Sequence, residues 1–129
     1  MIEENAREIY NEIVDEVDDK RREYKKAKQK LKDFVREWSY AVMFDKYEKY
    51  IGKKVVIHYL AINGKERKTE VGYLKEFRWV AGDMEVAKDG LYPFLVKPKK
   101  DGSMSKQYFP KWDNTQAEVR SITKIEVVE

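Results

Sequence analysis

Lysines and aromatic rings alternate through residues 94–112, FLVKPKKDGSMSKQYFPKW, a stretch with five lysines and one acid. The dipeptide Asp101-Gly102 tolerates the positive φ angles of a two-residue hairpin turn, which predicts two short strands in a fixed register. Counting outward from that turn sets Lys97 directly opposite Lys106. Like charges that face one another destabilise a ladder. We therefore expect the two lysines to bind an anion, and a phosphate is the simplest one.

Nucleic acid is the anionic ligand that best suits bases interleaved with rings. Lysines follow the phosphates, while rings stack on the bases at roughly 1–3 kcal/mol for each base. We expect Tyr108 and Trp112 to be the exposed rings, and the candidate contacts of the hairpin are Lys97, Lys99, Lys106, Tyr108 and Trp112. The alternative is that the lysines and Pro98 protect an edge strand against sheet-to-sheet aggregation.

A second basic segment covers residues 20–36, with nine bases and two acids, and follows residues 1–19, with eight acids and one base. Bases clustered along a helix are a common electrostatic footprint for a nucleic-acid backbone. The candidate contacts in this segment are Arg21, Arg22, Lys25 and Lys28. A simpler interpretation is that the opposite charges complement the helix macrodipole, or that acidic and basic segments of two antiparallel helices pair.

Glycine and proline divide the chain, because all six glycines and all three prolines lie at or beyond residue 52. Residues 1–51 are expected to form a long helix, and residues 52–129 a β-rich part. Apolar residues repeat every seven positions in the first part, as in a coiled coil, and only Lys20 interrupts the pattern. The stripe predicts a homodimer through Tyr10, Ile13, Val17, Tyr24, Leu31, Phe34 and Trp38.

A helical hairpin that folds back near Asp18 is the alternative to this continuous helix. We favour the continuous helix, because no Gly, Pro or Asn marks a turn there. A partner helix is then expected to cover the stripe. The apolar end of the helix, around Trp38, Val42, Phe44 and Tyr47, could instead cap the β-rich part.

The second part reads as short strands separated by glycines at intervals of 8 to 12 residues. Strands at this spacing predict a small all-β barrel or sandwich. The five expected strands cover residues 53–62, 68–80, 84–98, 105–112 and 118–128. Asn63-Gly64 predicts a second two-residue turn. The expected class is α+β, with a long N-terminal coiled-coil helix followed by a small five-stranded antiparallel barrel. We expect residues 50–129 to fold without the helix.

This arrangement resembles the Sm-like and SH3-like small barrels. The second strand of the Sm family has a glycine, an apolar residue two positions on and an aromatic residue three further, and Gly72, Leu74 and Phe77 have that spacing. The resemblance implies a small barrel. The Asp/Asn signature with which the family holds uridine bases is absent from RWVAGDMEV, so the resemblance supplies no base-binding residue.

Residues for catalysis are sparse. The chain has no cysteine and a single histidine, His58, whose apolar neighbours in VVIHYL indicate a position on a strand face rather than a catalytic base. These residues cannot build a usual zinc site, and no phosphate-binding glycine loop occurs. Asp83 and Glu85 could form a carboxylate pair, although acids in such a loop are usually solvated. We expect no enzymatic activity, no cofactor and no metal.

Composition also bears on the setting of the protein. The absence of cysteine suits a reducing compartment, and no apolar run is long enough to span a membrane, so we expect a soluble, cytoplasmic protein. Abundant Lys and Glu beside only seven Asn and Gln resemble thermophile composition. Non-enzymatic binding of nucleic acid, DNA or RNA, is the favoured function. The alternative is a protein-interaction adaptor with an oligomerising helix and a peptide-binding barrel.

Overall fold

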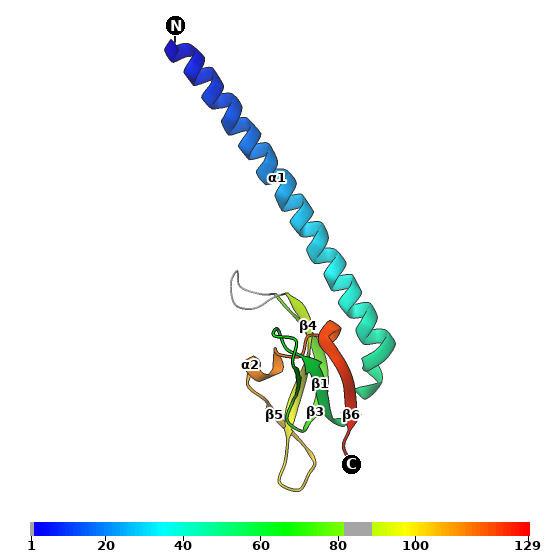
Figure 1. The fold of residues 1–129 in the computed structure, drawn as a ribbon. Coiled ribbons are helices and arrows are strands. Elements are labelled where there is room, and N and C mark those ends of the chain that lie inside the picture. Colours follow the sequence, from blue (N-terminus) through cyan, green and yellow to red (C-terminus); the bar gives the residue numbers. More distant parts are fainter. Residues whose placement is uncertain (1, 82–88) are drawn as a thin grey trace. The chain divides into compact units, whose positions relative to one another are not determined.

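The structure, a computed structural model, describes residues 2–81 and 89–129, with side chains from residue 5 onward. The chain divides into two compact units, Met1–Phe34 and Val35–Glu129, and each is described by itself. Helix α1 runs without a break over Ile2–Val42 (Figure 1). The predicted continuous helix is confirmed, and the alternative of a hairpin near Asp18 is wrong.

Two short helical segments follow α1. The π-helical turn η1 covers Met43–Tyr47, and the 3-10 turn η2 covers Glu48–Tyr50. The first glycine of the chain, Gly52, then ends the helical region with a φ of +88°. The helical part of the chain thus extends nearly to the change in composition that the glycines mark.

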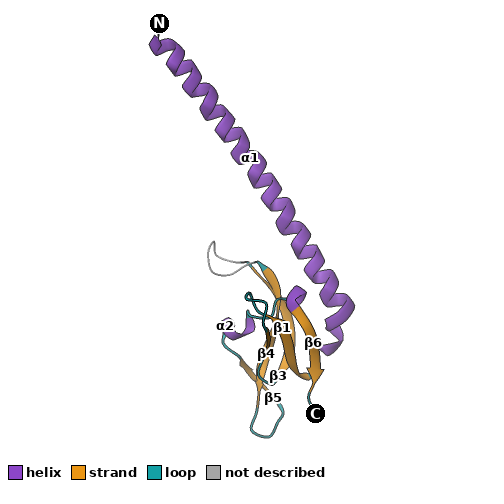
Figure 2. Cartoon of the chain, viewed as in Figure 1, coloured by secondary structure: helices purple, strands orange, loops and turns teal. Residues whose placement is uncertain are grey.

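Six antiparallel strands form one sheet in the second unit (Figure 2). They are β1 (Lys54–Leu60), β2 (Glu66–Lys68), β3 (Gly72–Val80), β4 (Gly90–Pro98), β5 (Met104–Tyr108) and β6 (Ile122–Val127). The order is β2-β1-β3-β4-β5, and β6 pairs with β1. The α+β class is confirmed. The pairings among the described residues leave the sheet open, so closure into a barrel stays a prediction.

The sequence analysis did not predict strand β2. Its three residues are all exposed, so it has no apolar alternation to mark it. Thr69 bridges the gap between β2 and β3, because its hydroxyl accepts a hydrogen bond from the Ile57 N–H at 3.0 Å and its N–H donates to the Ile57 carbonyl oxygen at 2.9 Å. One edge of β1 is therefore occupied by β3, Thr69 and β2 in turn.

Strand β1 alternates between a buried and a more open face. Val55, Ile57 and Tyr59 are buried, whereas His58 lies on the opposite face, as its sequence context predicted. The Nε2 of His58 is 3.0 Å from Glu126 Oε1, without hydrogen-bond alignment, and Nδ1 is 4.0 Å from Glu66 Oε1. The histidine thus lies between two carboxylates of neighbouring strands.

The core of the second unit includes the end of the helical region. Its buried members are Met43, Tyr47, Val55, Ile57, Tyr59, Leu74, Leu91, Leu95, Ala117, Val119, Ile122 and Ile125. The Tyr47 hydroxyl donates to the Ile122 carbonyl oxygen at 3.1 Å, and the Ser39 hydroxyl donates to Glu118 Oε1 at 3.0 Å. The core therefore extends beyond residues 50–129, because η1 supplies two of its side chains, in agreement with the alternative that the apolar end of the helix caps the β-rich part.

Gly72, the glycine of the Sm-like spacing, has a packing role in this sheet. A Cβ at this position would lie 2.7 Å from the Phe109 ring and 3.1 Å from Leu95 Cβ, so a larger residue would displace the ring. The glycine allows the segment after β5 to pack directly on β3. The fold of a helix followed by a small antiparallel sheet is compatible with the small β folds that the sequence resembles.

Candidate nucleic-acid interface

The hairpin that joins β4 to β5 has a three-residue loop. The Lys99 N–H donates to the Ser103 carbonyl oxygen at 2.7 Å, and the Gly102 N–H donates to the Lys99 carbonyl oxygen at 2.8 Å. Gly102 has a φ of +87°, and no residue other than glycine has a positive φ in the described ranges. A two-residue type I′ turn needs two positive φ angles. The hairpin was predicted correctly, but its loop is one residue longer.

The turn that joins β1 to β2 has the same form. Ala61 and Lys65 close it, and Gly64 has a φ of +77°. The Asn63 side chain accepts from the Lys65 N–H, as Asp101 accepts from the Ser103 N–H in the other turn. Both Asx-Gly pairs thus mark hairpins in which only the glycine adopts the left-handed conformation.

The longer loop changes the pairing of β4 with β5. Val96 lies opposite Tyr108 and Pro98 opposite Met104, with an irregularity between the two pairs. The register counted from a two-residue turn is therefore wrong, and Lys97 and Lys106 both lie within the irregularity.

The single acid of this segment, Asp101, accepts hydrogen bonds within the turn. Its carboxylate accepts hydrogen bonds from the Ser103 N–H at 3.0 Å and the Ser103 hydroxyl at 2.6 Å, and these bonds lower the pKa of Asp101. The Tyr73 hydroxyl of β3 donates to the Gly102 carbonyl oxygen at 2.5 Å. The loop is held at both sides, and its carboxylate forms no ion pair among the described residues.

The hairpin lysines differ in exposure. Lys99 and Lys106 are exposed, whereas Lys97 is half-buried, with its ammonium 5.9 Å from the centre of the Phe109 ring. None of the five lysines of residues 94–112 makes a salt bridge in the part of the chain that the structure describes. The hairpin is therefore a patch of uncompensated positive charge.

Three other cations of the second unit form ion pairs. Arg78 forms an ion pair with Glu76, Arg120 lies 3.0 Å from Glu118, and Lys124 lies 2.9 Å from Glu126. The Lys124 ammonium lowers the pKa of Glu126. Lys54, Arg67, Lys68 and Lys75 of the sheet, like the hairpin lysines, form no salt bridge among the described residues.

Tyr108 contacts side chains of strands β3 and β4. Its hydroxyl donates to Glu76 Oε1 at 3.1 Å, and the Arg78 guanidinium lies 4.9 Å from the centre of its ring. The Phe94 ring packs against it edge-on, with 6.5 Å between the ring centres. Tyr108 is therefore half-buried rather than exposed as expected, and its contact with a base stays a prediction.

Trp112 is exposed, as predicted. It lies in the single-turn helix α2 (Lys111–Asn114), and 72% of its surface is accessible. Buried Asn114 ties α2 to the sheet: its Oδ1 accepts from the Leu95 N–H at 3.1 Å, and its Nδ2 donates to the carbonyl oxygens of Leu95 and Phe109 at 3.3 and 3.2 Å. Sequence analysis overlooked Asn114, since an amide in a polar stretch has no marker of burial.

A cleft of about 180 Å³ adjoins α2. It lies between the turn that follows β2 and the helix, with Leu95 and Phe109 among its apolar residues. The polar groups include Lys68, Glu70 and Gln116. The cleft is small, but its mixture of a cation, a carboxylate and an amide offers hydrogen bonds beside the exposed tryptophan.

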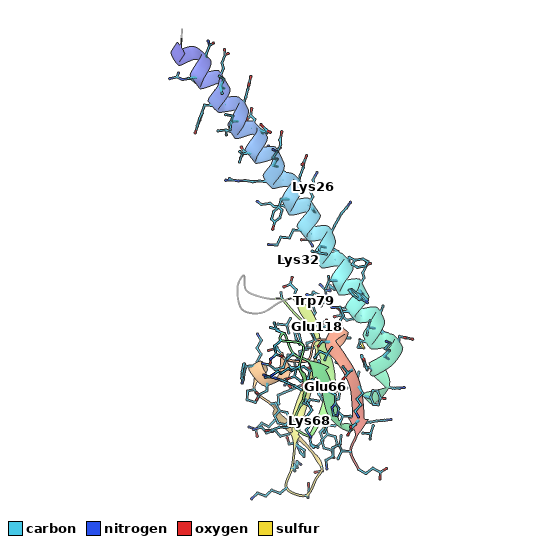
Figure 3. All side chains as sticks on the ribbon, viewed as in Figure 1. Lys26, Lys32, Glu66, Lys68, Trp79 and Glu118 are labelled. Carbon is cyan, nitrogen blue, oxygen red and sulfur yellow. The ribbon has the colours of Figure 1, made fainter. Side chains whose placement is uncertain are left out.

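The predicted helix contacts belong to the first unit. Val17, Lys20, Arg21, Tyr24, Lys25 and Lys28 line one surface of α1. Arg22 lies 3.7 Å from Asp19, and Lys20 lies 3.1 Å from Glu16 (Figure 3, where Lys26 and Lys32 mark this region). The structure describes the hairpin and this segment in separate units, so it does not bring the two predicted groups of contacts together.

Other kinds of site find no support in the described ranges. Within residues 2–81 and 89–129 there is no group of three His, Cys, Asp or Glu side chains that could hold a metal ion, and no helix of these ranges is long and apolar enough to cross a membrane. Asp83 and Glu85 lie outside the described residues. Comparison of the chain with protein-family models, curated proteins and solved structures found no match.

Proposed function

We propose that the protein binds nucleic acid without catalysing a reaction, and that the β4–β5 hairpin with α2 forms the contact surface. The observation that carries the proposal is that the lysines of residues 94–112 form no salt bridge among the described residues, in a segment that also exposes Trp112. A salt-bridged lysine must give up its partner before it binds a phosphate, whereas Lys99 and Lys106 carry no such cost. The favourable electrostatics come mainly from release of the counterions that surround the phosphates.

Trp112 serves as the stacking platform of this surface. A ring that stacks on a base contributes most when it is already ordered, because binding then costs little conformational entropy. Asn114 provides that order by fixing α2 to Leu95 and Phe109. The cleft beside α2 offers Lys68 and Gln116 for hydrogen bonds to a base edge or a sugar. Stacking accepts any base, so we expect weak sequence preference and a preference for single strands.

Lys97 has a secondary role in this proposal, because its ammonium already lies near the Phe109 ring. The helix residues Arg21, Arg22, Lys25 and Lys28 could add sequence-independent phosphate contacts. They are weaker candidates than the hairpin lysines, since an acidic segment precedes them in the same helix.

Replacement of Lys99, Lys100 and Lys106 with Gln is expected to weaken binding of a single-stranded oligonucleotide and to reduce its salt dependence. Each lost phosphate contact lowers the slope of log K against log salt by about 0.7 for single strands, which gives a total of about 2. Fluorescence anisotropy at several salt concentrations measures the slope. A matched variant with Gln at Lys46, Lys65 and Arg67, all exposed and outside the hairpin, should keep the wild-type slope. Equal slopes for the two variants would refute the assignment.

Replacement of Trp112 with Ala is expected to cost roughly 1–3 kcal/mol of binding free energy, the usual contribution of one stacked base. The fold should be unaffected, because the side chain is mostly exposed. Trp112→Phe keeps a ring and should retain part of the affinity. Titration of both variants at low salt separates stacking from charge. Undiminished affinity in Trp112→Ala would show that bases do not stack there, and salt-insensitive capture of a peptide by the hairpin would favour the adaptor function.

A further inference from the structure

One face of α1 is apolar along the whole first unit. Five side chains at the core positions of the heptad are between 42% and 67% exposed: Tyr10, Ile13, Val17, Tyr24 and Leu31. This unit, described by itself, is a single helix. A helix of this kind gains most of its stability from packing of its apolar face rather than from helix propensity. The face therefore needs a partner of matching length.

The middle of this face is flanked by bases on one side and by acids on the other. In the heptad abcdefg, with Tyr10 and Val17 at position a, the flanking positions are e and g. Between residues 7 and 34, the e positions hold Arg7, Val14, Arg21 and Lys28, and the g positions hold Ile9, Glu16, Glu23 and Lys30. A partner helix that fits must bring acids to the e side and bases to the g side.

A second copy of the chain in parallel orientation meets this requirement. Parallel helices place each g residue beside the e residue of the next heptad in the other helix. Glu16 then lies beside Arg21 of the second copy, and Glu23 beside Lys28. No g–e pair along α1 sets like charges together. We propose that α1 pairs with α1 of a second copy of this chain in a parallel, in-register coiled coil.

An antiparallel pair fits the flanks less well. Antiparallel helices place e beside e, and the e positions of α1 hold no acid, so Arg21 and Lys28 would face bases or valines in every register. The opposite net charges of residues 1–19 and 20–36 do not outweigh this, because most of those charged residues occupy the outer positions b, c and f. Exposed charges more than about 8 Å apart are largely screened at physiological ionic strength.

Lys20, at position d, favours the in-register pair. In that pair the two Lys20 residues share one layer of the core, whereas a shift by one heptad would place a lysine in two layers. A polar residue in the core specifies register at some cost in stability. The cost is reduced here, because the Lys20 ammonium lies 3.1 Å from Glu16 Oε1 of its own helix, at the edge of the face.

The parallel orientation attaches both copies of the second unit to the same end of the coiled coil. Two copies of any site on that unit are then tethered to one another, which raises the effective concentration at the second site once the first is bound. The pairing itself concerns only the first unit and does not rest on the proposed binding of nucleic acid.

The orientation is tested by distances between spin labels in the full chain. The chain has no cysteine, so Glu8→Cys, Asp15→Cys and Arg22→Cys each provide a single labelling site, and all three lie at position f. A parallel, in-register pair gives the same short distance at the three sites. In an antiparallel pair, a step of one heptad shifts the two labels along the axis by roughly 21 Å, at about 1.5 Å of rise for each residue, so the three distances differ.

Charge reversal tests the flanking pairs themselves. Glu16→Lys sets like charges beside Arg21 of the second copy and should raise the dissociation constant of the pair roughly tenfold, because each exposed ion pair is weak and the dimer loses two. Arg21→Glu alone should weaken the pair similarly, and the two changes together should recover most of the affinity. Residues 16 and 21 are not neighbours on one helix surface, so this recovery reports contact between the copies. Glu12→Lys, the same charge change at an outer position, is the matched control and should leave the constant unchanged.

Equal label distances, a sedimentation mass of two chains and recovery in the double variant support the proposal. Three unequal distances, a monomer at concentrations up to the millimolar range, or a mass other than that of two chains would overturn it. A Glu16→Lys variant that associates as strongly as Glu12→Lys would overturn it as well, because the flanking pairs would then not lie between the helices.

Discussion

Removal of residues 1–34 is expected to leave residues 35–129 folded, whereas removal of residues 1–49 is expected to unfold the sheet. The first cut falls at the boundary between the two compact units. The second cut deletes Met43 and Tyr47 from the core and leaves the Ile122 carbonyl oxygen without the Tyr47 hydroxyl. Burial of a side chain of this size contributes about 1.5–3 kcal/mol, so the loss of two, about 3–6 kcal/mol, reaches the lower end of the stability of a small domain, roughly 5–15 kcal/mol.

Dispersion of amide signals in two-dimensional NMR spectra distinguishes the two outcomes. Residues 35–129 should give dispersed signals and a cooperative thermal transition, and residues 50–129 should give the narrow dispersion of an unfolded chain. A chain of residues 50–129 with dispersed signals would show that η1 is dispensable to the core. Restoring residues 35–49 to it is the matched control, because it adds back only the helical residues of the second unit.

Replacement of Glu118 with Ala is expected to destabilise the second unit by about 3 kcal/mol. One carboxylate oxygen accepts from the Ser39 hydroxyl at 3.0 Å and from the Leu91 N–H at 3.3 Å. The other accepts from the Arg120 N–H at 2.7 Å. Leu91 of β4 pairs with Trp79 of β3, and Figure 3 labels both Trp79 and Glu118. A buried donor left without an acceptor costs about 1–3 kcal/mol, and the two part-buried donors, the Ser39 hydroxyl and the Leu91 N–H, lose theirs, whereas the exposed Arg120 N–H can bond to water.

Two variants separate this effect from a loss of charge. Glu118→Gln keeps one acceptor oxygen, and its amide can donate to Ser39, so we expect an intermediate loss of stability. Glu48→Ala removes a carboxylate from an exposed position of η2 and should change the free energy of unfolding by less than about 1 kcal/mol. Chemical denaturation of the four proteins provides the values. If Glu118→Ala is as stable as Glu48→Ala, Glu118 does not connect α1 to the sheet as described.

Local signals in the sequence predicted the continuity of α1 and the two hairpins. The helix was predictable because residues 1–51 contain no helix-breaking residue and keep a heptad pattern through Lys20. The hairpins were predictable because Asn-Gly and Asp-Gly suit several tight turns. For the same reason these two dipeptides could not distinguish a two-residue loop from a three-residue loop. The register of β5 against β4 was therefore predicted wrongly.

The remaining errors concern contacts between distant residues. Tyr108 contacts Glu76 and Arg78, which lie about thirty residues earlier in the chain. No local sequence pattern predicts contacts between residues so far apart. Met43 and Tyr47 lie outside the core positions of the heptad, and only the packing of the sheet shows that both belong to the core. The exposure of Trp112 was predictable, but the amide of Asn114 that fixes its helix was not.

Three amides of the sheet donate to side chains rather than to a neighbouring strand. They are the N–H groups of Ile57, Leu91 and Leu95, with acceptors on Thr69, Glu118 and Asn114. A hydrogen bond within a ladder breaks when strands separate, but each of these bonds also breaks when one side chain changes rotamer. The exchange of these three amide hydrogens with solvent is therefore governed by local side-chain motion, on a faster timescale than that of the ladder around them.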